Sequence, residues 1–399
     1  MHEPGFGAAL AFARDLIRIP GAPGAEGEVA QRVKHEMESL GFDEVWTDEV
    51  GNVIGRIRGQ ARTPAVMLNC HLDVVDIGEP DTWEHGPYSG DVADGYLHGR
   101  GAMDIKGPLA IQTYAAATFA RTPPPSDLYV AHTVLEERGG WGMEHLLKSG
   151  TVKPDAVILG EATSGDICVG HRGRAEIIVE IVGRAAHASA PERALNPIAL
   201  LPRVIPALEQ FAQGLDENEI LGPSTAAPTA LETQPRSRNV IPDRVRIVLD
   251  WRVLPGITRQ DAVAAVERVV REVVPDPEPY AIHVRFATER QRTWTGRERE
   301  RAMFTPGYVI DPEHPVVLAA VRAVASQTGR TPAVRPWTFA TDGGHSCGIH
   351  GIPTIGYAPG DERFAHTNRE RLSLAEAERA FRAYPALVRA VGNAAGQQI

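Results

Sequence analysis

The chain has 399 residues, of which 43% are hydrophobic and 23% charged, a composition typical of a soluble globular protein with about two domains. A formal net charge of −10 without any basic block argues against nucleic-acid binding, and no apolar run approaches the roughly 20 residues that cross a bilayer. The three cysteines have no paired spacing, which excludes a disulfide framework. Because residues 1–20 lack the pattern of a signal peptide, we expect a cytoplasmic protein that binds neither nucleic acid nor membranes.

Helical and strand-like segments alternate in the first part of the chain. Periodicity and composition predict helices over residues 26–40, 106–120 and 142–148. Short apolar runs predict buried strands over residues 65–70, 128–135 and 156–159. This alternation indicates an α/β fold with a mainly parallel sheet between helices.

The pattern changes near residue 173. The following segments predict strands over residues 175–182, 245–253 and 281–286. They also predict helices over residues 194–211 and 258–274, the second with Thr258 as its N-cap. Two helices between three strands indicate a small α+β domain with an open antiparallel sheet.

The last part of the chain returns to the earlier pattern. The polar segment 288–301 is interpreted as a connector, and we then expect a helix over 314–328, a strand over 353–357 and a helix over 374–394 that is kinked at Pro385. The chain should therefore leave the α/β domain and re-enter it. The predicted limits are 1–173 and 290–399 for the α/β domain and 174–289 for the inserted domain.

Potential metal ligands lie where the predicted strands end and in two loops. They are His71 and Asp73 after the first strand, Glu136 and Glu137 at the end of the second, Glu161 after the third, Asp104 in a Gly-rich turn that opens a helix, and His366 in a late loop. In open α/β sheets, ligands bind beyond the carboxyl ends of the strands. So many acids in one place would repel one another unless cations neutralised them. His and carboxylate ligands without thiolate suit two zinc ions, with cobalt or manganese as alternatives.

Each of these residues also has an ordinary structural explanation. A single His is usually on the surface or in the core, and a Glu-Glu pair usually lies on a solvated face. Glu136 and Glu137 differ because they close an apolar run and precede Gly139 and Gly140. The whole set supports a functional site because every member falls at a strand end, in a loop or in a Gly-rich turn.

Five motifs make the sequence similar to a known enzyme family. They are His-x-Asp-Val-Val at His71, Gly-Arg-Gly-x-x-Asp-x-Lys-Gly at Asp104, Glu-Glu-x-Gly-Gly at Glu136, Gly-Glu-x-Thr at Glu161, and the late His at His366. Over nearly its whole length the chain resembles the metallopeptidase family that contains acetylornithine deacetylase, succinyl-diaminopimelate desuccinylase, aminoacylase and carboxypeptidase G. The resemblance implies a zinc-peptidase-like catalytic domain with an inserted ferredoxin-like domain that acts as lid and dimerisation domain.

The same resemblance implies a role for each residue. Asp104 would bridge two metals, with His71 and Glu161 completing one site and Glu137 and His366 the other. Asp73 would orient the imidazole of His71. Glu136 would be the general base that takes a proton from the bridging water and passes it to the leaving amine.

Three residues of the middle domain match positions of that family. His187, in Gly-Arg-Ala-Ala-His, would come from the partner subunit of a homodimer and stabilise the oxyanion. Asn239 and Arg252 resemble substrate-binding positions, with Arg252 holding a substrate carboxylate. Without the resemblance, these would be interpreted as a loop histidine, a turn residue before Pro242 and a solvated residue on a sheet face.

The sequence therefore predicts a metal-dependent amidohydrolase that acts on an N-acyl amino acid or a small peptide with a free carboxylate. Deacylation of an N-acetylated amino acid is the preferred reaction, and a dipeptidase or carboxypeptidase with the same two metals is the alternative. A non-catalytic metal-binding protein is disfavoured because Glu136 and all five ligands are present. A two-metal phosphatase or nuclease is disfavoured because no P-loop or other phosphate-binding set accompanies the ligands.

Overall fold

A computed structural model describes residues 4–397, which fold into two compact units. The first unit contains the chain up to His171, Gln291–Arg299 and the chain from Val309 onward; the second contains Arg172–Arg290 and Glu300–Tyr308. The chain thus leaves the first unit and re-enters it. The exact domain limits predicted from the sequence remain a prediction.

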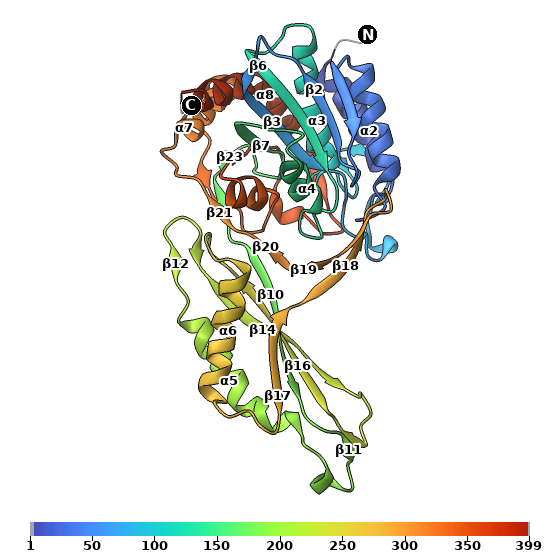
Figure 1. The fold of residues 1–399 in the computed structure, drawn as a ribbon. Helices are drawn as coiled ribbons and strands as arrows, with labels where there is room; N and C mark the ends of the chain where they lie inside the picture. The colour runs from blue at the N-terminus through green and yellow to red at the C-terminus, as the bar shows by residue number, and fades with distance from the viewer. Residues whose placement is uncertain (1–3, 398–399) are drawn as a thin grey trace. The chain divides into compact units, whose positions relative to one another are not determined.

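An eight-stranded sheet forms the centre of the first unit (Figure 1). In spatial order its strands are β1 (Glu44–Thr47), β2 (Val53–Ile57), β6 (Ser126–Thr133), β3 (Ala61–His71), β7 (Ala156–Leu159), β23 (Thr354–Gly356), β8 (Ile167–Cys168) and β22 (Val334–Arg335). The pairs β6–β3, β3–β7, β7–β23 and β8–β22 are parallel, whereas the others are antiparallel. The predicted α/β fold with a mainly parallel sheet is confirmed.

Six helices accompany this sheet in the described part of the unit: α1 (Phe6–Ile17), α2 (Gly27–Ser39), α3 (Lys106–Ala117), α4 (Trp141–Ser149), α7 (Pro315–Thr328) and α8 (Leu374–Ala395). Helices α3 and α8 pack on β3, while α1 packs on α3 and α7 on α8. Every residue of α3 is buried, which its many small side chains permit. Among the described residues, no helix has both the length and the apolar character needed to cross a membrane.

The second unit is an antiparallel sheet with two helices on one face. Its strands are β14 (Thr225–Gln234), β16 (Arg244–Arg252), β10 (Arg174–Val182) and β17 (Ala281–Phe286), with β20 (Phe304–Thr305) paired to β10. Alternate residues of β16 are buried and pack in one core with α5 (Leu201–Gln213) and α6 (Arg259–Val273). Each fully buried Val, Leu or Ile side chain contributes about 1.5–3 kcal/mol to the free energy of folding. The buried face of the sheet therefore stabilises the unit, and the opposite face stays polar.

The start of α6 agrees with the sequence, whereas the helix predicted over 194–211 begins late. Thr258 and Asp261 form a reciprocal capping box that fixes the first turn of α6. In the other segment, the side chain of Asn196 accepts a hydrogen bond from the backbone N–H of Ile198 and starts a 3₁₀ turn instead. Helix α5 therefore begins only at Leu201.

The prediction that residues 288–301 form a connector without regular structure is wrong. This segment forms a hairpin of β18 (Thr288–Arg292) and β19 (Glu298–Ala302). A backbone hydrogen bond from Thr293 to Arg297 closes its turn, and Gly296 adopts a φ of 88°, which glycine accepts without strain. The indole of Trp294 donates to the backbone oxygen of Gly51 and so ties the turn to the first unit. Charged side chains conceal the strand pattern of this hairpin in the sequence.

Candidate metal centre

Three neighbouring parallel strands bring four of the predicted residues to one edge of the main sheet. Strand β3 ends at His71, which lies opposite Thr133 at the end of β6. Glu136 and Glu137 follow β6, and Glu161 follows β7. Since the three strands run parallel, their carboxyl ends coincide, as the sequence predicted.

Asp104 lies between two imidazoles. Its Oδ1 is 3.2 Å from Nε2 of His71, and its Oδ2 is 3.2 Å from Nε2 of His366. The second imidazole also contacts Glu137, with 3.0 Å between Nε2 and Oε1. One carboxylate thus faces two separate imidazoles with its two oxygens, as a carboxylate shared by two cations would.

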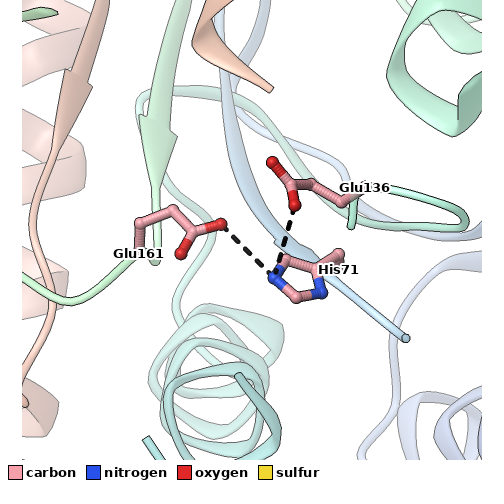
Figure 2. A group of neighbouring side chains, drawn as sticks. All are labelled: His71, Glu136 and Glu161. Carbon is pink, nitrogen blue, oxygen red and sulfur yellow. Dashed lines mark ion pairs between the residues drawn. The ribbon is translucent and has the colours of Figure 1, made fainter. Parts of the chain in front are cut away.

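Two further glutamates approach His71 (Figure 2). Oε1 of Glu161 is 3.4 Å from Nε2 of His71, and Oε2 of Glu136 is 4.0 Å from the same nitrogen. Figure 2 shows both carboxylates pointing at the same ring nitrogen of His71, Glu161 from the left of the view and Glu136 from above. All of these side chains are largely buried, except that of His366, which is 52% exposed and marks the open side of the cluster.

Asp73 is completely buried behind this cluster. Its carboxylate accepts the backbone N–H groups of Glu136 and Glu137, each at 3.1 Å. His71 is instead fixed through the backbone oxygen of Asp73, 2.8 Å from Nδ1, while the carboxylate oxygen is 3.6 Å from that nitrogen. Asp73 therefore holds the turn that carries both glutamates as well as the imidazole.

That turn is locally strained. Strand β6 stops at Thr133, two residues before the predicted end, and Leu135 adopts a φ of +56°. His366 has a similar φ of +59°. Left-handed backbone at non-glycine residues is uncommon and collects at functional sites, where the surroundings hold it in place.

The electrostatics of the cluster is dominated by its carboxylates. Burial raises the pKa of Glu136 well above its usual value and that of Glu161 to about 7. Burial would lower the pKa of His71, but the nearby carboxylates of Asp104 and Glu161 outweigh this effect and raise that pKa well above normal. The carboxylates around His71 thus strongly favour binding of positive charge.

Divalent cations fit this arrangement. Three-residue sets of potential ligand atoms lie within 4.8 Å of one another in His71–Glu136–Glu161 and in His71–Asp104–Glu137. Among the residues that the structure describes, none hydrogen-bonds the buried Oδ1 of Asp104 with acceptable geometry. A buried carboxylate oxygen without a hydrogen bond is costly, and a cation would remove that cost. The oxygen and imidazole donors, without thiolate, match zinc, cobalt or manganese.

Several buried residues around the cluster were not predicted. Glu370 accepts the backbone N–H of Asp104, Glu26 accepts that of Leu135, and Asp342 accepts the hydroxyl of Thr133. The only signal for them in the sequence is negative charge, which is shared by many exposed residues, so pattern alone could not select them.

The three predicted residues of the middle domain belong to the second unit, whereas the residues of this cluster belong to the first. His187, at the end of β11 (Ala186–His187), pairs with β15 (Val240–Ile241) and thereby lies next to Asn239, whose backbone oxygen accepts from Ala188. The imidazole of His187 is exposed, and its Nδ1 lies within hydrogen-bonding distance of the hydroxyl and the backbone N–H of Ser189. Arg252 lies on the polar face of β16 and donates to Asp250.

Comparison with known proteins identifies the family. Residues 67–390 match the model of peptidase family M20/M25/M40. The chain belongs to this family. It is 32% identical to the uncharacterized protein YgeY of Escherichia coli K12 over 90% of this chain and 88% of that one. It is 29% identical to the succinyl-diaminopimelate desuccinylase of Methylorubrum populi over 93% of this chain and 95% of that one.

Among solved structures, a dinuclear metal-binding M20 peptidase, YXEP of Bacillus subtilis, shares the fold with a TM-score of 0.71 at 17% identity, over 97% of this chain and 98% of that one. Membership of the family makes this M20 protein a metal-dependent amidohydrolase or peptidase, as the sequence predicted.

Proposed function

We propose that this M20 protein removes the acyl group from an N-acyl amino acid by means of two zinc ions. The observation that carries the proposal is the position of Asp104, whose two oxygens each lie 3.2 Å from a different imidazole. In the proposed assignment Asp104 would contribute to both metal sites, His71 and Glu161 would complete one of them, and Glu137 and His366 would complete the other. Cobalt or manganese would serve the same donors.

In this proposal Glu136 is the general base. Bound divalent ions would supply Lewis acidity, which would lower the pKa of a nearby water and polarise the amide carbonyl. The carboxylate of Glu136 takes the proton of that water as the water attacks, and then delivers it to the leaving nitrogen. Asp73 keeps Glu136 at its place by accepting the N–H groups of the turn. Burial and neighbouring carboxylates raise the pKa of Glu136 in the metal-free protein.

Residues of the second unit complete the proposed site. We assign His187 to the oxyanion of the substrate, and Asn239 and Arg252 to its polar and carboxylate groups. His187 is proposed to serve the site of the partner subunit in a homodimer formed through the second unit. Its exposed imidazole supports this assignment, because the side chain is accessible to a partner. A cytoplasmic location is kept as a further prediction.

An activity screen tests the proposed reaction. The zinc-loaded protein is incubated with N-acetyl amino acids, N-succinyl amino acids and dipeptides, and released amine is measured together with released acid. We expect amino acid plus acetate or succinate from the acyl substrates. Release of two amino acids from dipeptides alone would contradict the deacylase and favour the peptidase. That alternative is supported by the relation to the M20 peptidase YXEP.

A further inference from the structure

A buried ion pair lies directly behind the metal centre. Arg100 and Glu370 are 2% and 1% exposed, and 2.6 Å separates Nη1 of the arginine from Oε2 of the glutamate. Burying two opposite charges gains little stability by itself, because both lose their hydration. The role of such a pair is therefore inferred from the other groups to which it is hydrogen-bonded.

Glu370 binds the turn that carries Asp104. Its Oε1 accepts the backbone N–H groups of both Met103 and Asp104 at 3.0 Å. The geometry repeats that of Asp73, whose carboxylate accepts two consecutive N–H groups at the Glu136–Glu137 turn. In both cases a buried carboxylate fixes the backbone of a proposed metal-binding turn without facing the metal centre.

Arg100 binds the two other loops of the site. Nη1 donates to the backbone oxygen of Thr367, the residue after His366, at 3.3 Å. Nη2 donates to the backbone oxygen of Asp76, in the segment that follows His71, at 3.1 Å. The guanidinium also lies over the Trp83 ring, 5.0 Å from its centroid, which limits its movement.

We propose that Arg100 and Glu370 are positioning residues that hold the loops of His71, Asp104 and His366 at fixed separations, and so set the affinity of the metal centre. The inference rests on the proposed function, because it assumes that these three residues are ligands. A planar guanidinium reaches the three loops at once, whereas a lysine ammonium is a single point charge on a flexible stem.

The test is metal binding by the otherwise complete protein. Zinc affinity is measured by competition with a chromogenic chelator, and cobalt absorption reports ligand geometry, for wild type and Glu370→Gln. We expect a zinc dissociation constant raised about 10- to 100-fold, the usual effect of losing a partner behind the ligands, and an altered cobalt spectrum.

The matched control is Asp127→Asn. Asp127 is also buried, pairs with Arg56 at 2.6 Å and accepts the backbone N–H of Gly59, but it lies at the opposite end of β6. We expect this change to lower thermal stability and leave zinc affinity unchanged. Unchanged affinity and cobalt spectrum in Glu370→Gln, or an equal loss in both variants, would overturn the inference.

Arg100→Lys covers the case in which Glu370→Gln does not fold, because it keeps the positive charge. It should raise the zinc dissociation constant by at least threefold, and wild-type affinity would again overturn the inference. The readout is independent of catalysis. A wild type that binds zinc but hydrolyses no amide would refute the proposed function and leave the positioning role intact.

Discussion

Glu136 differs from the other acids of the cluster in its distance from the imidazoles. Its Oε2 lies 4.0 Å from Nε2 of His71, whereas the contacts of Asp104, Glu137 and Glu161 with an imidazole measure 3.0–3.4 Å. In the proposed function Glu136 acts on a water and is not a metal ligand, and its longer distance from the imidazole supports that assignment. The position suits a base better than a ligand.

Replacing Glu136 by Gln should separate these two roles. Gln keeps the size and the hydrogen-bonding oxygen but cannot accept a proton, so we expect kcat to fall by about 10²- to 10⁴-fold while zinc content stays near that of wild type. Steady-state kinetics and metal analysis check this, with the exposed Glu28→Gln on α2 as the control. Near-normal turnover would exclude Glu136 as the base, and lost zinc would make it a ligand.

For a helix or strand, the degree of burial decides whether the element could be predicted from the sequence. Strands β3, β6 and β7 each contain a short buried run that is mainly apolar, so both these strands and the acids that follow them could be predicted. Strand β14 lies at the sheet edge with most residues exposed and includes Pro228, so it lacks any such pattern. Likewise, Glu370 is 266 residues from Asp104 in the sequence, and only the tertiary fold brings them together.

A buried histidine on strand β6 leads to a prediction about how the stability of the protein depends on pH. Burial lowers the pKa of His132 to about 3, so the imidazole is neutral in the folded protein. The unfolded chain binds a proton at His132 near its ordinary pKa of about 6.5. Stability is therefore fully present above pH 6.5 and declines as the pH falls toward 3, by up to about 1.4 kcal/mol per pH unit for this group.

His132→Gln should remove this contribution, because Gln retains a donor toward the Thr113 hydroxyl, which lies 2.9 Å from Nε2 of His132, but does not titrate. Urea unfolding of both metal-free proteins between pH 7 and 5 measures the difference. We expect the free energy of unfolding of the variant to decline less steeply than that of wild type. Parallel curves would show that His132 does not cause the acid sensitivity.

At the scale of the whole molecule, the shared-site homodimer predicts complementation between two inactive variants. His187→Ala lacks the oxyanion residue and Glu136→Gln lacks the base. A mixed dimer would contain one complete site, formed by Glu136 of one subunit and His187 of the other. Random exchange between equal amounts should restore about a quarter of wild-type activity, since half of the dimers are mixed and each has one of two sites.

Activity is measured after subunit exchange, and sedimentation gives the oligomeric state. Each variant alone serves as the control. Absence of recovery in mixed dimers, or a fully active monomer, would contradict the shared site. The proposed deacylase would then need its oxyanion group from within one chain.

The central claim is that the cluster around Asp104 binds two divalent ions on which amide hydrolysis depends. The most direct measurement is titration of the chelated protein with zinc, following bound metal and activity together. The account predicts no hydrolysis of the preferred acyl-amino acid without metal, and recovery that is complete at about two equivalents per chain. An enzyme that stays active after thorough chelation, or that recovers without binding metal, would contradict the account.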